Sequence, residues 1–277
     1  MKTKIALFSA FILIIVLSAF LLNDLEISKS LYNPDNIFAL FIQQYGELPG
    51  IFILLIASVI WGFNNKSYKS KFRLIIIISS ALVTTFLILY SVYLIFFYTS
   101  DPLVVFNQHK ILASISVIIF ILIYIILHYS INFKSSLKIL TFVKSALLTG
   151  LIGYLFFVQP LKIFWGRIRF RDLDPLFTNF TAWYLPNGID GNQSFPSGHA
   201  AMSFMLLPLV ILVWNKKPII KSLVISLVCM WGVLVCLCRI VIGAHYATDV
   251  LFGSAGIIVA FLLSLKILRK DLTELKK

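Results

Sequence analysis

Long apolar runs with short polar segments between them dominate the chain. A bilayer core takes roughly 20 apolar residues per helix, with about 17 to 25 tolerated. The runs that fit this template are approximately Ile5–Leu22, Leu48–Phe63, Leu74–Phe97, Ile111–Leu127, Leu140–Leu161, Ala200–Trp214, Ile219–Leu237 and Asp249–Leu265. Because backbone groups in lipid must bond within their own segment, each run is predicted to be a helix. We therefore expect an all-α fold, a polytopic membrane helix bundle of about eight transmembrane helices.

Two N-terminal segments allow alternatives. The run Ile5–Leu22 follows Lys2 and Lys4, as a secretory signal would, but no clear small-residue cleavage site follows it, so an uncleaved anchor is expected. The segment Ile37–Tyr45 is amphipathic. It could lie on the membrane surface as a helix or be a plain connecting loop.

Composition agrees with a membrane protein and argues against a nucleic-acid-binding protein. Hydrophobic residues make up 60% of the 277 positions and charged residues 13%, which is typical of an integral membrane chain. The formal net charge of +13 could suggest nucleic acid, but the basic residues form short clusters between apolar runs instead of one stripe with interleaved aromatics. We expect no nucleic-acid partner.

The loop charges predict the orientation. With the N-terminus inside, most of the 24 basic residues fall in cytoplasmic segments, which places both termini in the cytoplasm. The Ile- and Lys-rich composition favours a multi-pass protein of the plasma (bacterial cytoplasmic) membrane. A group of cations beside the fifth and seventh runs breaks the rule on the outer face: Lys162, Arg167, Arg169, Arg171 and Arg239. These cations need another explanation.

The first outer segment carries four of these cations just beyond the fifth run. Guanidinium groups of Arg167, Arg169 and Arg171 suit phosphate because their planar fork can bind two oxygens, and Lys162 adds a point charge. The alternative is a cluster at the membrane edge that reaches toward lipid headgroups.

The second outer segment is Ser194-Phe-Pro-Ser-Gly-His199, which runs directly into the sixth apolar run. Pro and Ser before an apolar run are typical of a helix start. Backbone N–H groups of Ser197 and Gly198 at such a start favour an anion, and His199 beside it could give a proton to a leaving oxygen. An ordinary helix cap with an interfacial histidine is the alternative.

The third outer segment contains Arg239, His245 and Asp249. A spacing of four would put His245 and Asp249 on one face of a helix. A carboxylate bonded to one ring nitrogen leaves the other nitrogen free to attack. The pair could instead be a satisfied polar contact at the membrane edge. All three segments lie on the same predicted face, so together they supply anion binders, an acid, a nucleophile and its orienter.

These residues resemble the type 2 phosphatidic acid phosphatase superfamily. Its signature has three blocks: Lys, six residues, Arg-Pro; Pro-Ser-Gly-His; and Ser-Arg, five residues, His, three residues, Asp. Here the blocks occur as Lys162 with Arg169 and Phe170, Pro196 to His199, and Cys238-Arg239 with His245 and Asp249. All spacings match, but Phe170 stands in place of Pro and Cys238 in place of Ser. Both departures flank cations, so they bear on substrate choice more than on catalysis.

The resemblance implies a role for each matched residue. Lys162, Arg169 and Arg239 would hold the phosphoryl oxygens together with backbone N–H groups near Ser197 and Gly198. His245 would form a phosphohistidine, oriented by Asp249, and His199 would protonate the departing group. No metal and no cofactor is expected. Arg171 and, less directly, Arg167 lie outside the signature and are candidate substrate contacts.

A membrane lipid substrate follows from the apolar runs, which soluble members of the superfamily would not need. Candidates are undecaprenyl pyrophosphate, phosphatidylglycerophosphate, phosphatidic acid and a glycolipid phosphate. A lipid phosphotransferase could use the same histidine intermediate. A transporter would instead place charges near the bilayer midplane. Residues 1–277 are expected to form a single integral membrane domain, with accessory spans over 1–140 and a catalytic helix core over 141–270.

Overall fold

The computed structural model describes residues 23–64, 70–96, 114–115, 117–128 and 134–276. Within these ranges there is no β-strand, so the predicted all-α class is confirmed for the part of the chain described. The helical elements are α2 (Asp24–Leu31), α3 (Ile37–Tyr45), α4 (Leu48–Phe63), α5 (Ser70–Phe96), α7 (Leu137–Thr149), η1 (Gly150–Val158), α8 (Gln159–Trp165), η2 (Phe170–Asp172), α9 (Gly198–Phe204), η3 (Leu207–Val213), α10 (Pro218–Val241), α11 (Ala247–Ile267) and α12 (Arg269–Glu274).

Five helices in the described ranges are long and apolar enough to cross a membrane. They are Ile37–Phe63, Lys71–Phe96, Leu137–Asp172, Pro218–Val241 and Ala247–Ile267. The predicted count of eight is not confirmed. The first predicted run, Ile5–Leu22, lies outside the described residues. The described part of the fourth run contains the shorter apolar helix Val117–His128, and the sixth run forms the shorter apolar helix Gly198–Val213.

The sixth run is short because its sequence interrupts the α-helix. Helix α9 ends at Phe204, and η3 continues as a 3₁₀ helix with Pro208 in its first turn. Proline lacks the N–H that the preceding turn needs and crowds its carbonyl, which disfavours a continuous α-helix. All residues of α9 are buried, against α4, α10 and α11. Helix α9 is therefore enclosed by other helices.

The segment 37–45, for which a surface helix and a plain connecting loop were the alternatives, is helical. Asn36 caps α3 by accepting a hydrogen bond from the Ala39 N–H at 2.9 Å. The side chain of Gln44 donates to the carbonyl groups of Leu94 and Ile95, at 3.2 and 3.1 Å, and so ties α3 to the end of α5. Together α3 and α4 make one apolar stretch, Ile37–Phe63.

Hydroxyl pairs join the long helices inside the bundle. Ser58 on α4 lies 2.8 Å from Thr84 on α5, and Ser145 on α7 lies 2.7 Å from Ser264 on α11, measured between side-chain oxygens. Small hydroxyl residues let helices approach closely and satisfy each other in an apolar surrounding. These contacts fix α4 to α5 and α7 to α11.

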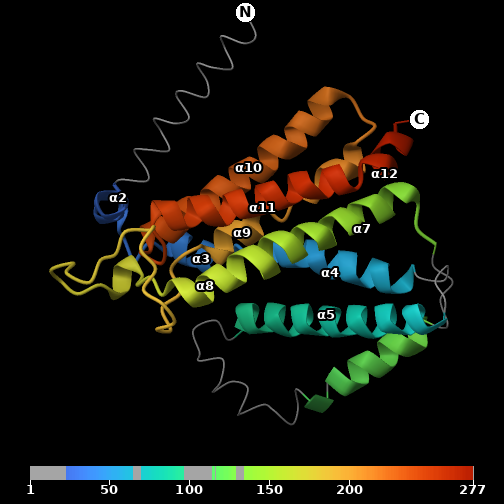
Figure 1. The fold of residues 1–277 in the computed structure, drawn as a ribbon, viewed down its shortest axis with the longest axis horizontal. Coiled ribbons are helices and arrows are strands. Elements are labelled where there is room, and N and C mark those ends of the chain that lie inside the picture. The colour runs from blue at the N-terminus through green and yellow to red at the C-terminus, as the bar shows by residue number, and fades with distance from the viewer. Residues whose placement is uncertain (1–22, 65–69, 97–113, 116, 129–133, 277) are drawn as a thin grey trace, which may run out of the picture.

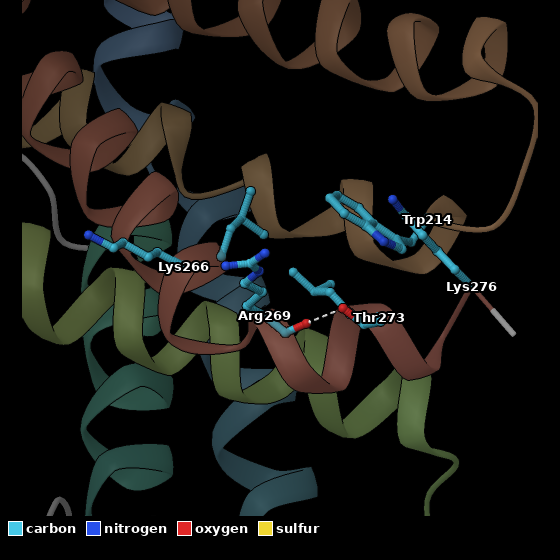
Figure 2. A pocket seen from close by; sticks show the side chains of 7 residues that line it. Trp214, Lys266, Arg269, Thr273 and Lys276 are labelled. Carbon is cyan, nitrogen blue, oxygen red and sulfur yellow. Dashed lines mark hydrogen bonds between the residues drawn. The ribbon is translucent and has the colours of Figure 1, made fainter.

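Figure 1 shows α2 and the long loop after α8 gathered at one end of the bundle, while α12 and the C-terminus lie at the other. A pocket of about 440 Å³ lies at this second end, beside α12 (Figure 2). Its polar lining residues are Trp214, Lys266, Arg269, Thr273 and Lys276. The described residues that line it include no histidine and no carboxylate, so this pocket lacks the acid, base and nucleophile expected of the site.

Gly253 provides a test of the packing between α11 and the turn before α9. A Cβ at this position would collide with the carbonyl oxygen of Ser197. We expect Gly253→Ala to lower the unfolding midpoint of the detergent-purified protein, because overpacking costs roughly 1–3 kcal/mol. The control is Ala255→Val on the exposed side of the same helix. Equal midpoints for the two variants, measured by heat-dependent loss of the monodisperse peak, would contradict this packing.

Candidate active site

The first predicted segment begins in the last turn of α8. Lys162 donates from Nζ to the carbonyl oxygen of Gln193 at 2.7 Å, which links α8 to the segment before α9. Arg169 is half-buried and directly precedes η2. Arg171 is more exposed and donates from Nη1 to Oε1 of Gln43 at 3.3 Å. Arg171 is therefore accessible to solvent, and its role as a substrate contact stays a prediction.

Arg167 differs from the expectation of a substrate contact, because its side chain is fully buried. Its Nη1 lies 2.6 Å from Oδ1 of Asp249, and its Nη2 lies 2.8 Å from Oδ2 of Asp24. The guanidinium carbon sits 4.0 Å from the centre of the Tyr246 ring. Both ends of the guanidinium fork are thus used within the protein, and Arg167 joins parts of the fold.

Asp24 brings α2 into this cluster. Its carboxylate accepts hydrogen bonds from both the N–H and the hydroxyl of Thr248 at the start of α11, the first at 2.9 Å. Burial raises the pKa of Asp24, and the positive charge of Arg167 opposes that rise. The N-terminal helix is thus bound to the turn that carries His245.

The second segment forms the start of α9. Ser197 caps the helix by accepting from the Ala200 N–H at 3.3 Å, while its own N–H donates to the carbonyl oxygen of Asp249 at 2.9 Å. The expected anion-binding N–H of Ser197 is therefore engaged. Gly198 and His199 occupy the first two positions of α9, whose N–H groups find no acceptor within a helix.

His199 is buried between two acceptors. Its Nδ1 lies 2.7 Å from Oε1 of Glu47, and its Nε2 lies 2.8 Å from the carbonyl oxygen of Gln43. Both partners come from the region of α3 and α4, which is distant in sequence. His199 is therefore held firmly by side-chain and backbone contacts.

The third segment turns sharply between α10 and α11. Arg239 stands in the last turn of α10 with only 3% of its surface exposed, and its carbonyl oxygen accepts from the N–H groups of Ala244 and His245 at 3.1 and 3.2 Å. Gly243 has a φ of +64°, a left-handed conformation that favours glycine. This turn fixes the position of His245.

His245 precedes α11, so it does not share a helix face with Asp249 as the spacing had suggested. Its Nδ1 lies 2.6 Å from the carbonyl oxygen of Ser194 and 3.7 Å from Oδ2 of Asp249. A carbonyl oxygen only accepts, so Nδ1 carries the proton and the lone pair lies on Nε2. The tautomer is the one that a nucleophilic Nε2 requires.

The pKa of His245 lies well below its ordinary value. Burial is the main cause, since it disfavours the charged imidazolium. The carboxylate of Asp249 opposes this effect, whereas the charges of Lys162 and Arg239 lower the pKa further. The imidazole is therefore held neutral.

Asp249 is linked to His245 through Ser194 as well as directly. Its Oδ2 accepts from the Ser194 hydroxyl at 2.6 Å and from the Tyr246 N–H at 2.9 Å. Ser194 in turn presents the carbonyl that binds His245. The carboxylate fixes the segment that orients the imidazole, in addition to its direct electrostatic effect.

The structure brings the three predicted segments together. Nη1 of Arg167 in the first segment lies 2.6 Å from Oδ1 of Asp249 in the third, and the Ser197 N–H of the second donates to the Asp249 carbonyl oxygen at 2.9 Å. The charge of Arg239 lowers the pKa of both His245 and His199. Within the described ranges no group of three or more His, Cys, Asp or Glu residues could hold a metal ion.

The sequence interpretation missed several residues that hold the site. They are Asp24, Gln43, Glu47, Ser194 and Thr248. Glu47 carried a usable signal, since an ionisable residue beside an apolar run is a functional candidate by default. Gln43 contributes a backbone carbonyl, which no residue type reveals.

Replacement of Arg167 tests the buried cluster. We expect Arg167→Leu to destabilise the protein by about 3–5 kcal/mol, because it leaves Asp24 and Asp249 buried without their cation. The unfolding midpoint in detergent provides the measurement. Arg171→Leu is the matched control, since its side chain is partly exposed. If both variants lost stability equally, the cluster would not have the structural role described.

Comparison with known proteins supports the assignment of these segments. The family model described as PAP2 superfamily matches residues 143–271, from the middle of α7 to beyond the end of α11, and this range contains all three polar segments. Neither the curated proteins nor the solved structures gave a match. Residues 143–271 are therefore similar to the type 2 phosphatidic acid phosphatase superfamily, and the five long apolar helices of the described ranges support a membrane protein.

Proposed function

We propose that the chain is a membrane-embedded phosphatase that hydrolyses a lipid phosphomonoester or pyrophosphate and releases inorganic phosphate. The observation that carries this proposal is the state of His245, whose Nδ1 proton is bound by the Ser194 carbonyl at 2.6 Å. The lone pair on Nε2 is then available to attack phosphorus. The similarity of residues 143–271 to the PAP2 superfamily supports activity on phosphate esters in general.

Three cations would bind the phosphoryl group. Lys162, Arg169 and Arg239 come from two of the three segments, and the N–H groups that open α9 at Gly198 would add to them. Phosphoryl transfer depends mainly on positioning and on stabilising charge on the non-bridging oxygens. Three cations around one group would supply that stabilisation.

The reaction would proceed in two steps. In the first, Nε2 of His245 forms a bond to phosphorus while the bond to the leaving oxygen breaks, and His199 gives that oxygen a proton. In the second, His199 takes a proton from water, the water oxygen attacks phosphorus, and the P–N bond breaks. Inorganic phosphate and the starting protonation state result. Asp249 would stabilise both steps through Ser194.

A lipid is the proposed substrate class because the site lies at one end of an apolar helix bundle (Figure 1). We propose that the site faces the extracytoplasmic side of the plasma membrane, and the excess of Lys and Arg in the segments expected to be cytoplasmic supports this orientation. Arg171, which is accessible to solvent, would contact the headgroup. The four lipid phosphates named above remain the candidate substrates.

Phosphate release provides the direct test. We expect detergent-purified wild type to release inorganic phosphate from at least one of the four candidate lipids in excess EDTA, and His245→Ala to release essentially none while eluting as a folded protein. Release by His245→Ala at the wild-type rate would refute the mechanism. No release from any lipid, with phosphoryl transfer to an added alcohol, would identify a phosphotransferase.

The acid limb of the pH profile tests the state of His245. Only the neutral imidazole attacks, and burial keeps its pKa below the ordinary value of about 6.5. As the pH falls, kcat/KM should therefore decline only at a pH below about 6.5. Titration of the substrate phosphate, whose second pKa lies near about 6, is measured separately by phosphorus NMR and divided out. A limb at or above the ordinary histidine pKa would contradict a neutral buried His245.

A further inference from the structure

The contacts of His199 require an extra proton in its neighbourhood. The carbonyl oxygen of Gln43, 2.8 Å from Nε2, can only accept, so Nε2 carries a proton. The carboxyl oxygen of Glu47 lies 2.7 Å from Nδ1, so a proton lies between these two atoms as well. The pair is thus either imidazolium with carboxylate or imidazole with carboxylic acid. In both cases it holds the proton that a general acid must give away.

Glu47 is buried, and both of its carboxyl oxygens have partners within the protein. Only 3% of its surface is exposed, and its second oxygen accepts a hydrogen bond from the Tyr90 hydroxyl at 2.8 Å. A buried carboxylate is costly unless it is paired and hydrogen-bonded. Here His199 provides the pairing and Tyr90 the remaining hydrogen bond.

The residues around His199 come from several helices. Glu47 immediately precedes α4, Tyr90 lies on α5, and the backbone of Gln43 belongs to α3. The charge of Arg239, from α10, lowers the pKa of His199, and the Tyr154 hydroxyl from η1 lies close to Gly198. Helices α3, α4 and α5 lie outside residues 143–271, the segment that the superfamily model matches.

We infer that Glu47 is the positioning residue for the general acid His199, and that α3, α4 and α5 are therefore part of the catalytic unit. This inference rests on the proposed function. In the first step the leaving oxygen replaces the Gln43 carbonyl as the acceptor of the Nε2 proton, and Glu47 keeps its hydrogen bond to Nδ1. In the second step Nε2 regains a proton from the attacking water, so no proton is lost overall.

Leaving-group dependence separates this role from a structural one. Dodecyl phosphate expels an alkoxide and needs the acid, whereas p-nitrophenyl phosphate expels a stable phenolate and needs it little. We expect Glu47→Gln to lower kcat/KM, which reports the leaving-group step, on the order of 10²-fold for dodecyl phosphate, at the low end of what acid–base catalysis contributes, and by less than about threefold for p-nitrophenyl phosphate. Glu47→Asp should restore part of the loss.

Two controls complete the experiment. Glu26→Gln removes a carboxylate that is exposed and paired with Lys29, and should leave both rates unchanged. Tyr90→Phe keeps the charge of Glu47 but removes one hydrogen bond to it, so a smaller loss with the same leaving-group preference is expected. This variant also serves if Glu47→Gln fails to fold.

A double variant gives the second readout. If Glu47 acts through His199, then adding Glu47→Gln to His199→Ala should cause no further loss of kcat/KM. Equal losses on both phosphates, or additive losses in the double variant, would overturn the inference while the proposed function stood. Absence of phosphate release by wild type from every substrate would instead overturn the proposed function itself.

Discussion

The ion cluster centred on Arg167 is the interaction on which the candidate site depends. One guanidinium, fully removed from solvent, contacts the carboxylates of Asp24 and Asp249. Arginine keeps its charge in proteins, so its burial requires both the anions and their geometry. The cluster holds α2, the segment after α8 and the start of α11 in one arrangement. Any movement of one of these elements would leave a charge buried without a partner.

That arrangement is transmitted to His245 by hydrogen bonds. Asp249, held by Arg167, accepts from the Ser194 hydroxyl, and the carbonyl of Ser194 accepts from His245. The fixed tautomer of His245 thus depends on a cation about which the local sequence around the histidine says nothing. Because the imidazole is also buried, its neutral form is favoured, which suits the proposed attack on phosphorus.

The sequence predicts the helices and the polar segments of the site, because both depend on residues that are close together in the chain. The apolar runs within the described residues form helices, and the polar segments around Lys162, His199 and His245 contact one another. The run at 200–214 gave a shorter helix than expected because Pro208 interrupts it. The partners of Arg167 and His199 could not be predicted in this way. Asp24 and Glu47 reach them from positions far away in the chain, and only the packing of helices decides which carboxylate meets which cation.

The two histidines have different hydrogen-bond partners at their ring nitrogens. His245 faces a carbonyl at Nδ1 and nearby cations, which favour a neutral ring, whereas His199 faces acceptors at both nitrogens, which keep a proton available. Such a division between two neighbouring groups is what a nucleophile and an acid require. Each state depends on a carboxylate from the N-terminal part of the chain, Asp24 through Arg167 and Glu47 directly. On this argument a fragment limited to residues 143–271 would keep the matched motifs but lose the contacts that set their protonation.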